Sequence, residues 1–331
     1  MTKGISVIMP NYNGRALLKT YLPYTFTALN ESKLDYEVII IDDCSTDDSI
    51  LFLKAEYPEV TIIKNEQNQG FSKSCNAGIV AASKSLTMLL NTDVKLSPDY
   101  FEGLISYFDH PETFGVMGRI IGMEDELIQD AARIPALSGF KIQPSRFYYS
   151  ADSTVKVPTL YLSGANALVS TEKLQALEGF NEIFSPFYAE DLDLGVRAWR
   201  NGWTCYYHHH AICKHQISST TRNLKKAKYI KMIYFRNRYI FYHLHWRGFN
   251  LALLHLQLFV TDFLFSVLIF NRYKVKAYLN FWKMMPAIQA SKNSYAVYVS
   301  WPNISLKQVV KYLSSAAKQL QLKKIPKGDL N

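Results

Sequence analysis

The 331-residue sequence has few cysteines and, in its last third, almost no acidic residues. None of its 4 cysteines has a C-x-x-C partner, which argues against a disulfide-stapled fold and predicts reduced thiols. Residues 221–331 hold 19 lysines and arginines against 2 acidic residues, whereas residues 1–220 hold 18 against 26. We therefore expect the last third to face an anionic partner, either a membrane or a nucleic acid.

The N-terminus lacks a signal-peptide pattern, because an apolar segment begins at Ile5 with no basic stretch or small-residue cleavage site before it. We expect a cytoplasmic protein. The length suits one large α/β domain with an appendage, which we place at residues 1–220 and 221–331.

The composition of residues 251–270 favours the membrane over nucleic acid. This segment reads LALLHLQLFVTDFLFSVLIF, and aromatic and basic residues flank it on both sides, as at a membrane interface. Asp262 near its middle opposes a true span. His255, Asp262 and Ser266 share one helix face, so this polar stripe can pack on the protein while the rest lies in the leaflet. Monotopic attachment is favoured over a span or an ordinary buried helix, and nucleic acid is an unfavoured partner.

Short apolar runs in the first hundred residues predict the strands of a parallel sheet. They are Ile5–Met9, Val38–Ile41, Val60–Lys64 and Leu86–Leu90, with helical spacing at Ala16–Leu29 and from Ser45–Asp48 to Tyr57. Parallel sheets bind ligands at the carboxyl ends of their strands. Polar residues follow three of these runs, in Pro10-Asn11-Tyr12-Asn13, Asp42-Asp43 and Asn91-Thr92-Asp93.

The segment Gly179–Trp203, GFNEIFSPFYAEDLDLGVRAWRNGW, places three carboxylates at the start of an amphipathic helix. Acidic residues are stabilised in the first turn of a helix by the partial positive charge of its N-terminus, so capping explains part of this cluster. It does not explain the aromatic, proline-containing approach Phe184–Tyr188, which predicts a carboxylate at a pocket wall. A carboxylate in that position is a candidate general base.

Together these blocks resemble a family 2 glycosyltransferase with the nucleotide-sugar-binding GT-A fold, over roughly residues 4 to 220. The resemblance implies a Rossmann-like, mostly parallel sheet flanked by helices, followed by a basic, membrane-associating helical region. It also implies sugar transfer from a nucleotide-diphosphate donor to an acceptor hydroxyl, with inversion at the anomeric carbon. Asn91 stands where many members have the first Asp of D-x-D, a departure that resembles the rhamnosyltransferase-like branch.

The resemblance assigns roles residue by residue. Asp93 and His215 would help to bind a divalent cation, Mn²⁺ or Mg²⁺. Asp191 would be the general base with Glu190 as the other candidate, and Asp193 a supporting or capping group paired with Arg197 four residues on. The donor site would be formed by strand-end residues, by the N-x-G-F-x-x-x-x-N-x-G segment and by a small-residue turn. These residues are Pro10, Asn11, Asn13, Asp42, Asp43, Asn68, Gly70, Asn76, Asn91 and Gly164.

Other functions stay open. A sugar nucleotidyltransferase would be expected to have a glycine-rich loop with Arg and Lys near the N-terminus. The segment Pro10–Arg15 has Gly14 as its only glycine. A non-enzymatic protein that binds membranes or nucleic acids would not need carboxylates at successive strand ends. The histidines at 208–210, with Cys205 and Cys213, fit no known zinc-finger spacing. The basic region predicts an enzyme at the cytoplasmic face of the cell membrane, peripheral or monotopic, whose acceptor is a lipid-linked or cell-surface polysaccharide precursor.

Overall fold

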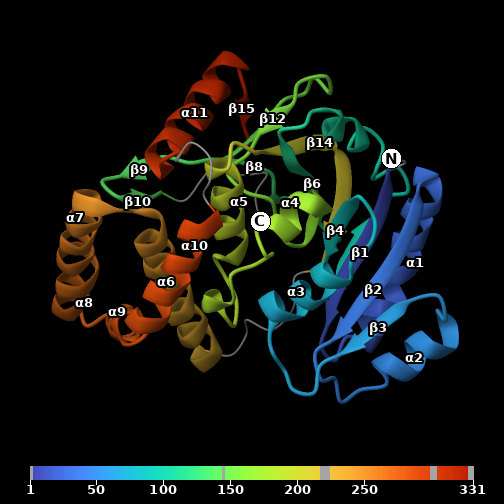
Figure 1. Ribbon diagram of the computed structural model, residues 1–331, viewed down its shortest axis with the longest axis horizontal. Coiled ribbons are helices and arrows are strands. Elements are labelled where there is room, and N and C mark those ends of the chain that lie inside the picture. Colours follow the sequence, from blue (N-terminus) through green and yellow to red (C-terminus); the bar gives the residue numbers. More distant parts are fainter. Residues whose placement is uncertain (1–2, 144–145, 217–223, 299–303, 327–331) are drawn as a thin grey trace.

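The computed structural model describes residues 3–143, 146–216, 224–298 and 304–326, and its centre is a mixed, mostly parallel sheet (Figure 1). One side of the sheet consists of adjacent parallel strands in the order β4-β1-β2-β3. Their bounds are β1 Gly4–Asn11, β2 Asp35–Asp42, β3 Thr61–Lys64 and β4 Leu86–Leu90. All four predicted strands are confirmed.

The other side of the sheet contains the later strands. β13 (Asn166–Ser170) runs antiparallel between β4 and β6 (Thr113–Gly122), and β14 (Thr204–His215) lies parallel to β6. Short strands extend this side, namely β5 Val94–Leu96, β7 Ile128–Asp130 and β12 Val157–Pro158. β5 pairs with the end of β14, so that Val94 lies opposite His215.

Helices cover both faces of the sheet. On one face, residues of α1 (Arg15–Ser32), α2 (Ser49–Glu56) and the segment before the 3₁₀ turn η1 (Ile105–Asp109) form a hydrophobic cluster with the strands. On the other face lie α3 (Phe71–Ala81), α4 (Thr171–Ala176) and α5 (Glu190–Arg200), in a second cluster. The predicted helices at α1 and α2 are confirmed, although the Asp48 side chain makes no capping hydrogen bond to α2.

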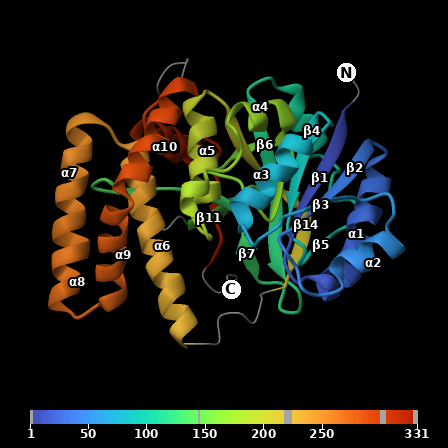
Figure 2. The same cartoon turned by 60° about the horizontal axis from the view of Figure 1, so that its bottom comes forward.

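A helical region follows the sheet and lies beside α5 (Figure 2). It comprises α6 Leu224–His245, α7 Gly248–Leu258, the π-helical turn η4 Phe259–Leu264, α8 Phe265–Leu268, α9 Arg272–Lys283, α10 Met285–Tyr298 and α11 Leu306–Gln319. The last strand, β15 (Lys323–Lys324), joins a small antiparallel sheet with β11 (Arg146–Tyr149) and β8 (Ala132–Ile134). β9 (Leu137–Ser138) and β10 (Lys141–Ile142) form a separate antiparallel pair.

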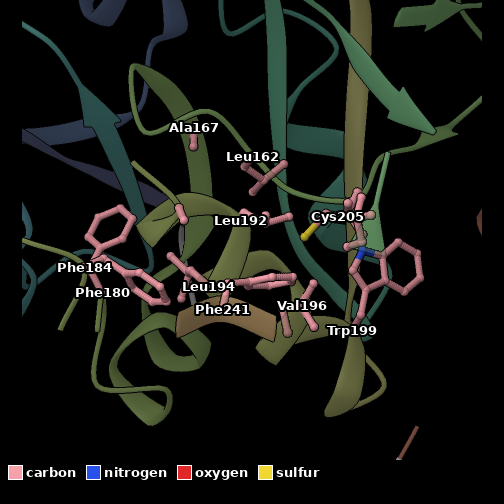
Figure 3. Close-up of a cluster of buried hydrophobic side chains, with 14 of the residues drawn as sticks. Leu162, Ala167, Phe180, Phe184, Leu192, Leu194, Val196, Trp199, Cys205 and Phe241 are labelled. Atoms are coloured by element: carbon pink, nitrogen blue, oxygen red, sulfur yellow. The ribbon is translucent and has the colours of Figure 1, made fainter. Parts of the chain in front are cut away.

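One hydrophobic cluster joins α5 to this helical region. Phe241 of α6 is fully buried and lies among side chains of α5, such as Leu194 and Val196 (Figure 3). Trp199 of α5 contacts Tyr312 of α11, with ring centroids 5.4 Å apart. The residues on either side of position 220 therefore share a core, and the division of the chain at that position stays a prediction.

The predicted polar stripe of residues 251–270 packs on the protein. Asp262 is 5% exposed and pairs with Lys141 at 2.7 Å and Lys274 at 3.7 Å, and Ser266 is fully buried. Among the described residues, Gly248–Leu268 is long and apolar enough to cross a membrane, with 22% of its apolar window buried. The remaining face exposes large apolar side chains: Phe249, Leu256, Phe259, Val260, Leu264, Phe265, Val267 and Leu268, followed by Ile269 and Phe270.

Candidate active site

A cleft of about 370 Å³ opens where the parallel strands end. Its walls come from the ends of β1, β2 and β4, from the start of α3 and from the loop before α5. The lining residues are Pro10, Asn11, Tyr12, Asp43, Asn68, Gly70, Phe71, Ser74, Asn91, Thr92, Asp93, Pro186 and Phe187. Six predicted donor residues and the predicted metal ligand Asp93 thus lie at one cleft.

Asp43 fixes the turn that leads into α3. Its Oδ1 accepts hydrogen bonds from the side chain of Asn65 and the backbone N–H of Gln69, and its Oδ2 accepts one from the N–H of Gly70, all at 2.8 Å. Gly70 has a φ of 83°, a conformation that glycine adopts without steric cost. The carboxylate therefore shapes one wall of the cleft through the backbone of this turn.

Asp93 and His215 face each other at the end of β4. Asp93 Oδ2 lies 3.4 Å from His215 Nε2, because β5 begins directly after Asp93 and pairs with the end of β14, which places Val94 opposite His215. Gln129 of β7 orients the imidazole of His215. The Gln129 Nε2 donates to the backbone carbonyl of His215, so the Gln129 Oε1 faces the ring and accepts a hydrogen bond from His215 Nδ1 at 2.7 Å. In a neutral ring this leaves the Nε2 lone pair facing Asp93.

The geometry at Asp93 fits a hard cation. Asp93 Oδ1 is buried and has no hydrogen-bond partner among the described residues, although buried carboxylate oxygens are normally satisfied. An imidazole nitrogen and a carboxylate oxygen are ligands that Mn²⁺-type ions accept, with phosphate and water completing the shell. Within the ranges described, three histidine, cysteine or acidic side chains are nowhere arranged around one metal position. A cation here would therefore depend on ligands from the donor.

Other predicted donor residues lie outside the cleft lining. Asp42 is fully buried and accepts hydrogen bonds from the Asn11 side chain and the Ser45 N–H. Asn13 Oδ1 accepts from the N–H of Thr46. These contacts hold the β1 and β2 loops together, and a donor role for either residue stays a prediction.

Asn76 and Gly164 also make structural contacts. The Asn76 carboxamide donates to the Phe180 carbonyl and accepts from the Phe180 N–H, both at 2.8 Å. A Cβ on Gly164 would lie 3.1 Å from the ring of Phe71, so the small residue admits a side chain that lines the cleft. Their direct contact with a donor is untested.

The candidate bases Glu190 and Asp191 begin α5. Glu190 is 9% exposed, and its Oε2 is buried without a hydrogen-bond partner among the described residues. Burial, and to a smaller extent the charges of Asp191 and Asp193, raise the pKa of Glu190 above the usual range. Burial also raises the pKa of Asp191, while the guanidinium of Arg133 lowers it. Both groups are thus shifted toward neutrality, as expected for carboxyls that accept protons near the working pH.

Arg133 of β8 lies beside this pair. It bonds Asp130 at 2.8 Å, and its guanidinium stacks between the rings of Phe147 and Tyr161. Gly195 allows α5 to approach this wall, since a Cβ there would lie 2.4 Å from the Cβ of Tyr161.

Asp193 is buried one turn after the start of α5. Its predicted pair with Arg197 is confirmed at 2.8 Å, and its other oxygen lies 2.9 Å from His245 Nε2 of α6. Asp193 lies in the first turn of α5, and a capping role stays a prediction. Asp193 also joins α5 to the helical region.

Comparison with known proteins assigns the chain to a family. Residues 6–177, more than half of the sequence, match the profile of the family described as Glycosyl transferase family 2. The chain belongs to glycosyl transferase family 2. An uncharacterized glycosyltransferase of Haemophilus influenzae is 30% identical over 105 residues, which are 32% of this chain and 34% of the relative. The chain therefore matches about a third of the length of that relative.

Solved structures with the same architecture are more distant in sequence. GalNAc-T7, solved with UDP, GalNAc and Mn²⁺, has a TM-score of 0.53 at 12% identity, covering 74% of this chain and 51% of that one. A mannosyltransferase of Pyrobaculum calidifontis, solved with GDP-Man and Mn²⁺, has a TM-score of 0.52 at 14% identity, covering 95% and 86%. These likenesses concern the fold alone, and they confirm the predicted GT-A fold.

Several site residues of this glycosyl transferase family 2 chain were not singled out from the sequence. Tyr12, 55% exposed at the cleft, lies between two predicted donor residues, and its place after a strand was the available signal. Phe187 also lines the cleft, and its aromatic loop was noted without a donor role. Gln129 and Arg133 lie on short strands that match no motif, and nothing in the local sequence indicated that they contact His215 or influence Asp191.

Proposed function

We propose that this protein is an inverting glycosyltransferase that moves a sugar from a nucleotide-diphosphate donor to an acceptor hydroxyl. The observation that carries the proposal is Asp93 at the cleft where the strands end: its Oδ1 is buried without a hydrogen-bond partner among the described residues, and its Oδ2 faces the imidazole of His215. Family membership supports the reaction class, and UDP and GDP-Man in the structural neighbours support this donor class. Asn91 before Asp93 supports a rhamnosyltransferase-like member, and the sugar itself is undefined.

Asp93 and His215 are the residues that would hold a divalent cation, Mn²⁺ or Mg²⁺. When bound, such an ion neutralises negative charge on the diphosphate leaving group. Gln129 keeps the imidazole nitrogen directed toward Asp93, and Asp43 keeps the Gly70 turn open for the donor.

Asp191 is proposed as the base, with Glu190 as the competing candidate. The acceptor oxygen attacks the anomeric carbon while its proton passes to the carboxylate, and the bond from that carbon to the phosphate oxygen breaks. The nucleoside diphosphate leaves with the bonding electrons. One displacement of this kind inverts the configuration and needs only one base. Burial is the largest cause of the raised pKa of both groups.

The helical region supports an acceptor that is carried on a lipid or belongs to a cell-surface polysaccharide precursor. The exposed apolar face of α7 and α8 continues into Phe270, which is 86% exposed, and basic residues such as Arg272 and Lys276 follow it. Apolar area combined with positive charge favours a membrane interface. We propose attachment to the cytoplasmic face of the cell membrane, peripheral or monotopic, through residues 221–331, with residues 1–220 as the catalytic part.

The test of the activity is donor binding and turnover with UDP-, GDP- and dTDP-sugars in Mn²⁺ or Mg²⁺. We expect Asp93→Ala to lose metal-dependent binding of the accepted donor. Asp191→Asn should keep donor binding while turnover falls on the order of 10²-fold or more. The control is Asp152→Asn, an exposed loop residue. If no nucleotide sugar binds with either metal, the proposal is wrong. If only Glu190→Gln stops turnover, Glu190 is the base.

The membrane proposal has a separate test. Phe270→Asp should reduce co-sedimentation of the protein with vesicles that contain phosphatidylglycerol. Val80→Asp, on α3 and 82% exposed in the wild type, is the matched control and should sediment as the wild type does. Equal sedimentation of both variants and the wild type would contradict attachment through this face.

A further inference from the structure

The loop before α5 holds an unfavourable backbone conformation. Tyr188 and Ala189, directly before Glu190, have φ values of 75° and 76°. Residues with a Cβ adopt this left-handed region at a cost of roughly 1 kcal/mol each, so it persists only where the surroundings determine it. Something outside the loop must therefore stabilise this entry into α5.

Asn237 of α6 supplies that stabilisation. Its side chain is fully buried, and its Nδ2 donates to the backbone carbonyls of Phe184, Phe187 and Tyr188, the last two at 2.8 and 2.9 Å. The amide has two hydrogens, so the three acceptors share them. One side chain thus contacts the beginning and the end of the loop.

The orientation of this carboxamide follows from its neighbour. Arg236 Nε donates to Asn237 Oδ1 at 2.9 Å, which places Nδ2 on the side of the carbonyls. The guanidinium of Arg236 also donates to the carbonyl of Ser185, inside the same loop. Four loop carbonyls are therefore satisfied by two consecutive residues of α6.

A second contact between the same helices limits the movement of α5. Asp193 and His245 are both fully shielded from solvent, and their side chains meet at 2.9 Å. Burial lowers the pKa of His245, so the neutral ring donates its Nε2 proton to the carboxylate. α6 thus holds the loop before Glu190 through Asn237 and the first turn of α5 through His245.

We propose that Asn237 is a positioning residue, which holds the loop 184–189 and thereby fixes the position of Glu190 and Asp191 at the start of α5. The inference rests on the proposed function, because it takes one of these carboxylates as the base. Asn237 touches neither donor nor acceptor in this role and acts through the backbone of the loop. Pro186 and Phe187 of the loop also line the donor cleft, so the loop links the two halves of the site.

Loss of this anchor should change the electrostatics of the pair as well as its position. The titratable or charged groups that influence Glu190 and Asp191, or are influenced by them, are Arg133, Asp130, Tyr161, Cys75, Tyr188 and Asp193. Burial is the largest cause of the raised pKa of both carboxyls. A loosened loop admits water, so the pKa values fall and the acidic limb of the rate profile moves to lower pH.

The experiment compares Asn237→Leu with Asn280→Leu in the full-length chain. Leucine has nearly the shape of asparagine, adds no charge and cannot donate. Asn280 of α9 is the matched control, since its carboxamide contacts only the sulfur of Met232 among the described hydrogen bonds. We expect Asn237→Leu to lose on the order of 10²-fold in kcat, to move the acidic limb to lower pH and to raise hydrogen exchange in residues 184–193. Asn280→Leu should keep the wild-type profile.

A rescue variant separates positioning from a general loss of folding. Ala189→Gly, added to Asn237→Leu, should recover part of the lost turnover, because glycine adopts a φ of 76° without the Cβ penalty. Thermal unfolding of each variant measures its folded fraction, and Asn237→Ala serves if the leucine variant does not fold. An absent rescue, or a loss of turnover that only follows the loss of folded protein, overturns the inference.

The outcomes also separate this inference from the proposed activity. If the wild type turns over no nucleotide sugar, the proposed function fails, and hydrogen exchange of residues 184–193 decides the role of Asn237. Increased exchange in Asn237→Leu alone then supports the anchor, and unchanged exchange overturns it. If the wild type is active and Asn237→Leu keeps its rate and pH profile, the inference is wrong while the proposed function stands.

Discussion

The cleft at the strand ends, the proposed donor site, and the loop 184–189, called the base loop after the role proposed for Glu190 and Asp191, are stabilised in different ways. The cleft is built from strand ends and turns, and its contacts lie within the sheet and its loops, such as Asp43 with Gly70 and Asp93 with His215. The base loop precedes α5 and depends on Asn237 of α6, which lies about fifty residues later in the sequence. The sheet order fixes the cleft, whereas the loop takes its shape from the helical region.

This difference has a consequence for mutation. A change in the cleft should alter donor or metal binding directly, because the side chains line it or hold its walls. A change at the base loop should act on turnover and its pH dependence, because α6 holds the loop that positions Glu190 and Asp191 and limits their contact with water. The following four variants test this division, in decreasing order of expected effect.

Asp43→Asn should destabilise the protein by about 2 to 3 kcal/mol, because a carboxylate that accepts two backbone N–H groups becomes an amide with one acceptor oxygen. Donor affinity should fall with it, since Gly70 lines the cleft. Urea unfolding and calorimetric titration with the accepted nucleotide measure the two effects. Asp48→Asn is the control, because the Asp48 side chain makes no capping hydrogen bond. Equal stability of the two variants would contradict the role of Asp43.

Gln129→Met should weaken Mn²⁺ binding in the presence of nucleotide by about tenfold, because the partner that orients the ring of His215 is lost. Electron paramagnetic resonance of free Mn²⁺ measures this affinity. The exposed Gln319→Met should bind as the wild type does. If Gln129→Met binds Mn²⁺ as tightly as the wild type, the orientation of His215 by Gln129 does not contribute to metal binding.

Arg133→Met should move the acidic limb of kcat/KM to higher pH, with a several-fold lower rate on that limb. The guanidinium lowers the pKa of Asp191, so its removal leaves more of the base protonated at a given pH. Arg133→Lys keeps the charge and should shift the limb less. A limb that stays in place in the methionine variant would indicate that Asp191 is not the titrating base.

Glu190→Gln should stabilise the protein only at higher pH. The pKa of Glu190 is raised in the folded state, so its contribution to stability is full below the unfolded value and is lost as pH rises through the folded one. Glutamine does not ionise and avoids this loss. We expect the difference in Tm between variant and wild type to grow by roughly 2 °C from about pH 5 to about pH 9. A difference that is constant with pH would contradict the raised pKa.

The sequence was most informative where polar residues directly follow an apolar strand. Leu86–Leu90 was predicted with the bounds that the structure shows, and Asp93 lies at the cleft as expected. Apolar runs and the polar residues after them follow from the short-range periodicity of parallel strands, which a single sequence displays. The helix face formed by Asp262 and Ser266 was readable for the same reason.

The sequence was least informative where a contact joins distant elements through the backbone. Asn237 bonds to carbonyl groups, which every residue has, so no pattern of residue types marks its partners. Asn76 matched a donor-site motif, yet both ends of its carboxamide bond the backbone of Phe180, 104 residues away. Gln129 and Arg133 lie on short strands whose place depends on the completed sheet. These roles require the tertiary structure.

The contact between Trp199 and Tyr312 bears on biosynthesis. α11 follows α5 by more than a hundred residues, so a ribosome releases the whole central sheet long before the helix that covers Trp199. Until then the nascent chain exposes a large apolar side chain beside its acidic cluster, a situation that favours aggregation or chaperone binding. A shortened gene that keeps all recognised glycosyltransferase motifs but stops before residue 306 should therefore give insoluble protein rather than a minimal enzyme.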